Sequence, residues 1–266
     1  MKPSIKINSK RNFKLSKRLQ EIEQLAVSAF IGPLPAYEHI WDCCCDHGLL
    51  GFSLLSGQVD TKAIIGINTK IHFVDIVPEL MADLDNKLNR FYQNDDNSSW
   101  ETHCIDVAKL PLEKYTGKHL IIIAGIGGDL MIEFIEAIHH KHKSINIDFL
   151  LCPVHHQYPL RQKLIELDFS LKHEVLVEDN HRFYEILMVS SLSDVNNLIN
   201  QTGNKIWLSN SSEQAEIAKR YLSKTLNHYQ RMQQGLKKSI EQDNQQDKSN
   251  DIQHIIDAYQ NIKLND

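Results

Sequence analysis

Two segments of this chain run from an apolar, strand-like stretch into a tight turn and then into a helical pattern, which strongly constrains the fold. Residues 39–48 (HIWDCCCDHG) carry an acidic turn, and residues 120–129 (LIIIAGIGGD) carry a glycine-rich turn. In doubly wound α/β folds, ligands sit where the carboxyl ends of neighbouring strands open into a crevice. The two ends therefore predict a single nucleotide-like ligand held between them.

Strand and helix patterns alternate through most of the chain. Strands are expected at residues 39–43, 71–75, 100–104, 120–124, 147–152, 170–178 and 183–190, and helices at 15–30, 48–56, 78–92, 128–140 and 159–167. Such alternation is typical of a mostly parallel sheet with crossover helices. The short turn Asp179-Asn180-His181 indicates that the last two strands form an antiparallel hairpin. By fold analogy, this order favours a Rossmann-like class I methyltransferase sheet over a nicotinamide dehydrogenase.

The part of the chain after the last predicted strand has a different character. Residues 191–210 are polar, and apolar positions at a three-four spacing follow over 215–236 and 252–262, separated by the polar stretch 242–251. Two such amphipathic helices around a turn form an antiparallel helical (coiled-coil) hairpin. The hairpin could be a packing appendage, a dimer contact or an RNA-gripping arm.

The composition is that of an ordinary globular protein, with 42% hydrophobic and 24% charged residues. No apolar run approaches the ~20 residues that a membrane helix needs. The basic N-terminus is not followed by the apolar region of a secretory signal. Five cysteines, three of them contiguous, fit no disulfide framework and favour a reducing cytoplasm. We therefore expect a cytoplasmic protein without membrane contact.

The formal net charge of −5 argues against a protein that coats nucleic acid indiscriminately. A basic block nevertheless precedes the first acidic residue, Glu21, and consists of Lys2, Lys6, Lys10, Arg11, Lys14, Lys17 and Arg18. Such a block can neutralise phosphates and position an RNA without reading its bases. The alternative is a solvated N-terminal arm. Lys14, Lys17 and Arg18 are the candidate RNA-binding residues.

Aspartates stand at or just after the ends of the first three predicted strands. Asp42 lies at the end of the first and Asp75 at the end of the second, where a carboxylate commonly accepts hydrogen bonds from ribose hydroxyls. Asp106 follows the third strand, where it could accept the exocyclic amine of an adenine. Its alternative role is that of a cap or turn residue.

Glycines and cysteines complete the candidate site. Gly125, Gly127 and Gly128 let the backbone approach a ligand closely, although this spacing also describes any tight strand-to-helix turn. The contiguous cysteines 43–45 could suggest a metal. Consecutive strand residues point to opposite faces, however, so these thiols cannot converge on one ion, and no metal is expected.

Four segments carry a resemblance to a known family: residues 15–19 (LSKRL), 42–47 (DCCCDH), 124–128 (AGIGG) and 178–186 (EDNHRFYEI). In these segments, and in the predicted C-terminal hairpin, the chain resembles the bacterial tRNA (adenine-22-N1)-methyltransferases, which use S-adenosylmethionine. The order and spacing of the segments and the chain length agree, so the resemblance covers nearly the whole chain. It implies a methyltransferase domain over residues 1–195, with a basic helix at 14–30, followed by a linker and helical hairpin over 196–266.

The resemblance also implies a reaction with tRNA as partner, and a monomer is one possible form of the protein. N1 of an unpaired adenine attacks the sulfonium methyl group in line, and the product is a cation. Asp46 would orient the base and stabilise the developing charge, and His47 would be its partner or a structural histidine. The target base must leave its stack to reach the pocket. The expected cofactor-binding residues are Asp42, Cys44, Asp75, Asp106, Gly125, Gly127 and Gly128.

The chain departs from the family pattern at two places. The family usually has Asp-Ile-Gly-Ser-Asp-His at the first strand end, and Cys44 stands here in place of its glycine. The family's Gln-Pro-Asn after the fifth strand becomes Cys-Pro-Val, so His155 or His156 would have to replace an asparagine beside Val154. These departures leave two alternatives: a methyltransferase with another acceptor, or a tRNA-binding protein with a decayed cofactor site.

Overall fold

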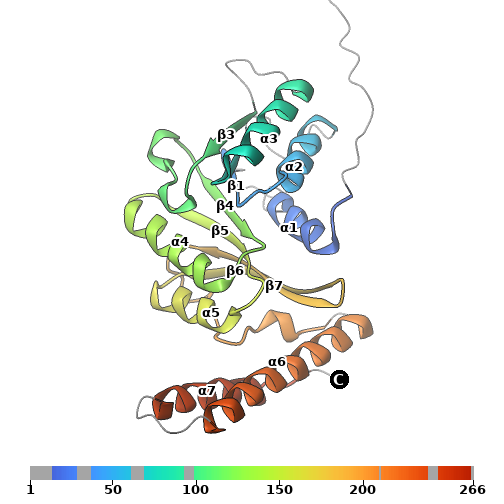
Figure 1. The fold of residues 1–266 in the computed structure, drawn as a ribbon, viewed down its shortest axis with the longest axis vertical. Helices are drawn as coiled ribbons and strands as arrows, with labels where there is room; N and C mark the ends of the chain where they lie inside the picture. Colours follow the sequence, from blue (N-terminus) through green and yellow to red (C-terminus); the bar gives the residue numbers. More distant parts are fainter. Residues whose placement is uncertain are drawn as a thin grey trace, which may run out of the picture.

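The computed structural model describes residues 14–28, 37–60, 69–92, 99–209, 211–238 and 245–264. One sheet lies between helices on both faces (Figure 1). Its strands are β1 (His39–Cys43), β2 (Lys70–Asp75), β3 (Trp100–Cys104), β4 (His119–Ala124), β5 (Ile147–Cys152), β6 (Ser170–Asp179) and β7 (Arg182–Ser190). The helices are α1 (Lys17–Ser28), α2 (Leu49–Asp60), α3 (Pro78–Phe91), α4 (Gly128–Lys141), α5 (Gln157–Glu166), α6 (Ser212–Lys238) and α7 (Gln245–Gln260), with the short 3₁₀ helices η1 (Val107–Lys109), η2 (Leu112–Lys114) and η3 (Lys205–Trp207).

The seven strands follow the order β3-β2-β1-β4-β5-β7-β6. Strands β1 to β5 pair in parallel, and β7 is antiparallel to both β5 and β6. The predicted Rossmann-like sheet with a closing hairpin is thus confirmed. In the hairpin turn, Asn180 and His181 have φ of 49° and 60°. Two left-handed central residues are the mark of a type I′ turn, whose twist matches that of the flanking strands.

Strand β4 explains the layering, because its side chains alternate between two cores. Leu120 and Ile122 pack in the core beneath α1, α2 and α3, whereas Ile121 and Ile123 pack in the core beneath α4 and α5. All four side chains are fully buried. A strand buried on both faces reads as a continuous apolar run, as expected for a parallel sheet covered on two sides. Helices cover both faces of the sheet, so the predicted ligand crevice has to lie at the ends of the strands.

Helix α1 begins at Lys17, two residues after the predicted start, and the Ser16 hydroxyl accepts a hydrogen bond from the Leu19 N–H at 3.4 Å. The predicted helix extends to residue 30, of which the structure describes the part up to Ser28. The basic residues Lys2, Lys6, Lys10 and Arg11 lie outside the described residues. Among the residues that the structure describes, no helix has both the length and the apolar character needed to cross a bilayer.

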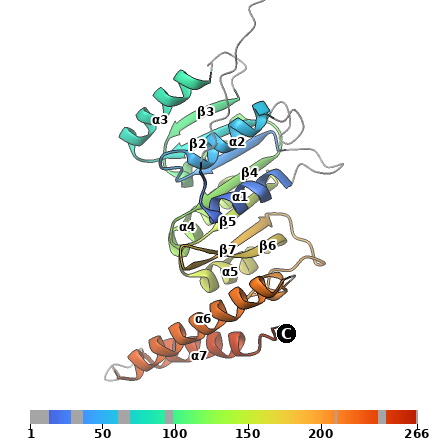
Figure 2. The same ribbon diagram turned by 90° about the vertical axis from the view of Figure 1, so that its right-hand side faces the viewer.

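The C-terminal helices α6 and α7 form the expected antiparallel hairpin, which lies beyond β6 and α5 (Figure 2). The polar stretch 242–251 was expected to interrupt the helices, yet α7 already begins at Gln245. Its glutamine, aspartate and lysine residues are compatible with a helix, so polarity alone did not mark the turn. The hairpin shares a hydrophobic cluster with the sheet domain through Tyr158, Leu176 and Tyr221. The division into two domains near residue 195 stays a prediction.

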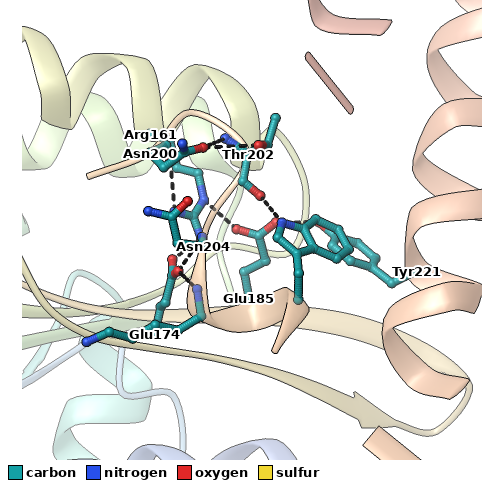
Figure 3. Close-up of polar contacts among 9 residues, drawn as sticks. Arg161, Glu174, Glu185, Asn200, Thr202, Asn204 and Tyr221 are labelled. Carbon is teal, nitrogen blue, oxygen red and sulfur yellow. Dashed lines mark hydrogen bonds and ion pairs between the residues drawn. The ribbon is translucent and has the colours of Figure 1, made fainter. Parts of the chain in front are cut away.

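A buried polar network ties α5, β6 and β7 to the linker and α6 (Figure 3). The guanidinium of Arg161 donates to Glu174 and to Glu185, each at 2.7 Å, and all three side chains are fully buried. Tyr221 on α6 donates its hydroxyl to the second oxygen of Glu185 at 2.6 Å. The second oxygen of Glu174 accepts the backbone N–H groups of Asn204 and Lys205. The carboxylates therefore hold the linker and α6 against the sheet.

The linker also covers the outer edge of β6. The backbone N–H of Leu171 donates to the carbonyl of Asn197 at 2.7 Å, and Ser170 forms an antiparallel bridge with Leu198. On its other side Ser170 pairs with Ser190 of β7. The start of this edge strand is thus paired on both sides.

Candidate functional site

The acidic loop after β1 lies against the end of β2. The backbone N–H of Asp46 donates to one oxygen of Asp75 at 3.1 Å, and the N–H of Cys45 donates to the carbonyl of Val74. Cys44 and Asp46 both have left-handed backbones, with φ of 55° and 51°. The acidic loop is therefore held against the end of β2 by Asp75.

Asp75 is buried and uses both carboxylate oxygens locally, since its other oxygen accepts the N–H of Val77 at 3.1 Å. Each carboxylate oxygen has two lone pairs, so these contacts leave room for further donors. The residue therefore both shapes the crevice and retains acceptor capacity. Its role as a ribose ligand stays a prediction.

Asp42 points towards the start of α2, where it accepts the N–H of Gly51 at 2.9 Å. Burial raises the pKa of Asp42 to about 7, against the opposing effect of the Gly51 hydrogen bond, and the charge of Asp75 adds to the rise. Asp106 accepts the N–H of Ala108 at 2.9 Å and so caps η1. The cap alternative considered for Asp106 is present, and the cofactor roles of both aspartates stay predictions.

The three contiguous cysteines diverge. Cys43 packs in the core beneath α4 and α5, and Cys45 packs in the core beneath α1 to α3. Cys44 lies between them at the crevice, where burial raises the pKa of its thiol to about 12 and the charges of nearby aspartates add to the effect. A thiol with so high a pKa is largely protonated at physiological pH and is therefore a poor nucleophile.

The glycine-rich loop after β4 is packed against the loop after β5. A side chain on Gly127 would place its Cβ 2.4 Å from the imidazole of His155, and one on Gly128 would lie 2.6 Å from the carbonyl oxygen of His156. Gly125 has φ of 87°, a region that favours glycine. The three glycines are thus required for different reasons, two by close approach and one by backbone conformation.

The structure distinguishes the two candidate histidines. His156 has a left-handed backbone, and its Nδ1 lies 2.7 Å from a carboxylate oxygen of Asp129, the second residue of α4. His155 lies over Gly127 instead, and its side chain is exposed at the crevice. Val154 beside it is 40% exposed and offers no polar side-chain atom. The imidazole of His155 is therefore exposed beside the glycine-rich loop, and a ligand-binding role for either histidine stays a prediction.

Arg18 differs from the other basic residues of α1. Its guanidinium carbon lies 4.9 Å from the ring centroid of Tyr184, and it contacts the buried thiol of Cys152. A Cβ on Gly125 would lie 3.5 Å from Nη1 of Arg18. Lys14 and Lys17 are exposed. Arg18 was predicted as an RNA-binding residue, which stays a prediction, and the structure places its guanidinium near Tyr184, Cys152 and Gly125.

Tyr184 is a crevice residue that the sequence reasoning did not single out. It belongs to β7, whose partner strand β6 supplies Asp179, and the Asp179 carboxylate accepts the backbone N–H of Arg18 at 3.3 Å. Both residues lie in the segment 178–186 that carried the family resemblance. The segment could have marked Tyr184 as a candidate site residue, but its contact with α1 depends on the tertiary fold.

Asp46 and His47 lie at the mouth of the crevice. Their side chains are 70% and 60% exposed, and Nε2 of His47 lies 3.8 Å from a carboxylate oxygen of Asp46. The separation is longer than a hydrogen bond. The two side chains are therefore accessible to an incoming molecule, and their catalytic roles stay predictions.

A separate hollow of about 700 Å³ lies at the other end of the sheet, lined in part by Tyr37, Asp148 and Lys172. Asp148 and Ser170 mark the amino-terminal parts of β5 and β6. Ligands of open α/β sheets bind outside the carboxyl ends, where the strand order reverses between β1 and β4. We therefore assign the candidate site to the crevice between the acidic and glycine-rich loops.

The fold is that of a Rossmann-like α/β protein, and its candidate ligand site lies at the switch point of the sheet. Residues 15–187 match the sequence model of a family described as methyltransferase domain. The chain belongs to that family. No curated protein matches the chain.

Solved structures of similar fold extend over nearly the whole chain. A protein of Listeria monocytogenes serotype 4b is 17% identical with a TM-score of 0.66, covering 93% of this chain and 98% of that one. The B. subtilis M1A22 tRNA methyltransferase TrmK is 16% identical with a TM-score of 0.63, covering 94% and 98%. M. capricolum TrmK, solved with S-adenosyl-homocysteine, is 16% identical with a TM-score of 0.64, covering 92% and 96%. The shared fold thus includes the C-terminal hairpin.

Proposed function

We propose that this protein is an S-adenosylmethionine-dependent methyltransferase that methylates N1 of an adenine in tRNA, at position 22 by resemblance. The observation that carries the proposal is the meeting of two strand ends, since the acidic loop and the glycine-rich loop follow the neighbouring parallel strands β1 and β4, and Arg18 of α1 lies near Gly125. Membership of the methyltransferase family supports the class of reaction. The likeness to TrmK over the full chain, hairpin included, supports the choice of substrate.

The residues of the crevice fit the proposed cofactor. S-adenosylmethionine supplies a methyl group on a positively charged sulfonium. The carboxylates of Asp46, Asp75 and Asp106 near the ends of β1, β2 and β3 favour a cation electrostatically, whereas Asp42 is partly neutral because burial raises its pKa to about 7. We assign Asp75 to the ribose hydroxyls and the backbone at Gly125 and Gly127 to the close approach of the cofactor. Cys44 and Asp106 border the same space, since both Asp75 and Asp106 act on the Cys44 thiol.

The target base enters from the mouth of the crevice in this proposal. Asp46 accepts a hydrogen bond from the exocyclic amine and stabilises the positive charge that develops on the base. His155 provides the polar contact that Val154 cannot make, and His156 stays with Asp129. Lys14 and Lys17 contact phosphates, which fixes the position of the RNA without reading its sequence. Arg18 packs against Tyr184 and forms part of the inner wall of the crevice.

The deciding experiment incubates the purified protein with unmodified tRNAs and isotopically labelled S-adenosylmethionine, followed by digestion to nucleosides. We expect labelled N1-methyladenosine from at least one tRNA. Label in a different nucleoside, or in a metabolite extract without RNA, would replace the adenine-N1 proposal with another acceptor. Calorimetric titration with S-adenosylhomocysteine is run in parallel. Saturable tRNA binding with no S-adenosylhomocysteine binding at millimolar concentration would show a decayed cofactor site.

Asp46→Asn tests the central residue of the proposal. The change preserves shape but removes the charge, so turnover should fall by about 10²-fold, the scale of one preorganised electrostatic contact. Asp168→Asn is the matched control, because Asp168 is also an exposed aspartate with a positive φ, 58°, and it follows α5. Single-turnover kinetics with saturating cofactor measure the effect. Equal rates for wild type and Asp46→Asn would assign Asp46 to the turn alone.

A further inference from the structure

A hydrogen-bonded row of imidazoles crosses β1, β2 and β3 on the sheet face that carries Trp41. Nδ1 of His39 lies 3.0 Å from Nε2 of His72, and Nδ1 of His72 lies 2.9 Å from Nε2 of His103. The register explains the row, since His72 pairs with Trp41 on one side and with Glu101 on the other. None of these residues belongs to the crevice described above.

The position of the proton on each ring can be assigned by starting from His39, at one end of the row. Nε2 of His39 contacts the carbonyl oxygen of Thr116 at 3.2 Å, and because a carbonyl only accepts, this nitrogen carries a proton. A neutral imidazole carries one proton, so its other ring nitrogen is an acceptor. Nδ1 of His39 is then an acceptor, so Nε2 of His72 donates to it. Nδ1 of His72 is left as a bare lone pair that faces His103.

Glu101, also on β3, brings a carboxylate close to the imidazoles of His72 and His103. A carboxylate oxygen of Glu101 lies 3.9 Å from Nε2 of His103, and the ligand atoms of His72, Glu101 and His103 all lie within 4.8 Å of one another. The hydroxyl of Tyr115 donates to that oxygen of Glu101 at 2.8 Å and orients the carboxylate. The ring of His72 is stacked on Trp41, with a centroid separation of 3.8 Å and an interplanar angle of 10°.

We infer that His72, His103 and Glu101 form a binding site for a divalent transition-metal ion of the zinc type. Two imidazoles and a carboxylate, with a further position for water, are a common zinc ligand set. A tetrahedral ion with Zn–N bonds near 2.0–2.1 Å needs its nitrogens about 3.3 Å apart. The observed 2.9 Å separation requires a widening of only a few tenths of an ångström. The ion takes the place of the proton between the two rings, and the neutral ring of His103 then carries its proton on Nδ1 instead of Nε2.

The groups around the three proposed ligands also favour metal binding. Metal-binding histidines usually donate their second ring N–H to an acceptor, as His72 does to His39, and ligating carboxylates are themselves hydrogen-bonded, as Glu101 is by Tyr115. Lys70 lies 3.4 Å from the other oxygen of Glu101 and opposes a cation there. The Lys70 charge is therefore expected to weaken the site without removing it. The bound ion would join edge strand β3 to β2.

The test uses the full-length protein without a histidine tag, and its readouts do not depend on methyltransferase activity. Equilibrium dialysis against micromolar Zn²⁺ should leave about one ion per chain at this site, and His103→Gln or Glu101→Gln should lower the affinity about tenfold or more. His140→Gln, at an exposed histidine on α4, is the matched control and should leave the affinity unchanged. Lys70→Met should strengthen binding.

Titration with Co²⁺ gives a second readout. The ion should quench the fluorescence of Trp41, because that ring is stacked on the ligand His72, and His103→Gln should abolish the quenching. Zn²⁺ added afterwards should restore the fluorescence by displacing Co²⁺. Wild type that retains no Zn²⁺ at these concentrations would overturn the inference. Zn²⁺ binding that His103→Gln and Glu101→Gln leave intact would also overturn it, by placing the ion at another of the 14 histidines.

Discussion

Cys44 adopts a left-handed backbone, with φ of 55°, a conformation that favours glycine. Such a conformation costs a residue with a Cβ roughly 1–2 kcal/mol. Replacement by glycine also removes the thiol, so the informative comparison is between Cys44→Gly and Cys44→Ala, which both lack it. We expect Cys44→Gly to be the more stable of the two by about 1 kcal/mol. Urea unfolding measures the difference, and equal midpoints would show that the loop relaxes around either residue.

Asp42 should make stability depend on pH in an unusual direction. Its pKa is raised from 3.8 to about 7, so between these values the folded protein holds more protons than the unfolded chain. Its contribution is therefore most favourable at low pH and declines as pH rises from about 4 to 7. Asp42→Asn lacks this titration. Its stability relative to wild type should increase between pH 5 and 8, by up to a few kcal/mol at 1.36 kcal/mol per pKa unit.

The comparison for Asp42→Asn is Asp251→Asn, which changes an exposed aspartate on α7. Chemical unfolding at several pH values measures both variants. The control should follow the wild-type profile. A profile of Asp42→Asn that stays parallel to wild type from pH 5 to 8 would mean that Asp42 ionises normally in the folded protein.

The loop between β4 and α4 gives a prediction about two adjacent glycines. A Cβ at Gly127 meets the exposed imidazole of His155, which can rotate away, whereas a Cβ at Gly128 meets the backbone carbonyl of His156 at 2.6 Å. Gly128→Ala should therefore cost about 1–3 kcal/mol, as overpacking does, and Gly127→Ala should cost much less. Thermal unfolding of the two variants measures this. A larger loss for Gly127→Ala would indicate that His155 is fixed in place.

The individual strands and most helices could be predicted from the sequence, because apolar runs such as residues 120–124 have no other stable place than a buried strand. The contacts between elements could not. The choice between His155 and His156 depends on the packing of the two loops after β4 and β5. The row of His39, His72 and His103 depends on the register of three strands, since the histidines are distant in sequence. The position of Arg18 depends on how α1 meets β7.

The polar network around Arg161 decides how the C-terminal hairpin is joined to the rest of the molecule. Tyr221→Phe removes the hydrogen bond to one oxygen of the buried Glu185 and should cost about 1.5–3 kcal/mol, the range for hydrogen bonds to charged groups. Tyr158→Phe is the matched control, because its hydroxyl donates to the neutral side chain of Gln201. It should cost about 1 kcal/mol. Equal losses in calorimetry would mean that the Glu185 charge is stabilised by Arg161 alone.

The linker that covers the start of β6 has a consequence for many copies of the chain together. An open edge strand presents free N–H and carbonyl groups, on which a strand of another copy can add. At Ser170 and Leu171 those groups are already paired with Asn197 and Leu198 of the same chain. A second copy would have to displace the linker before it could extend the sheet there. The segment that connects the sheet to the helical hairpin thus also guards this edge against polymerisation.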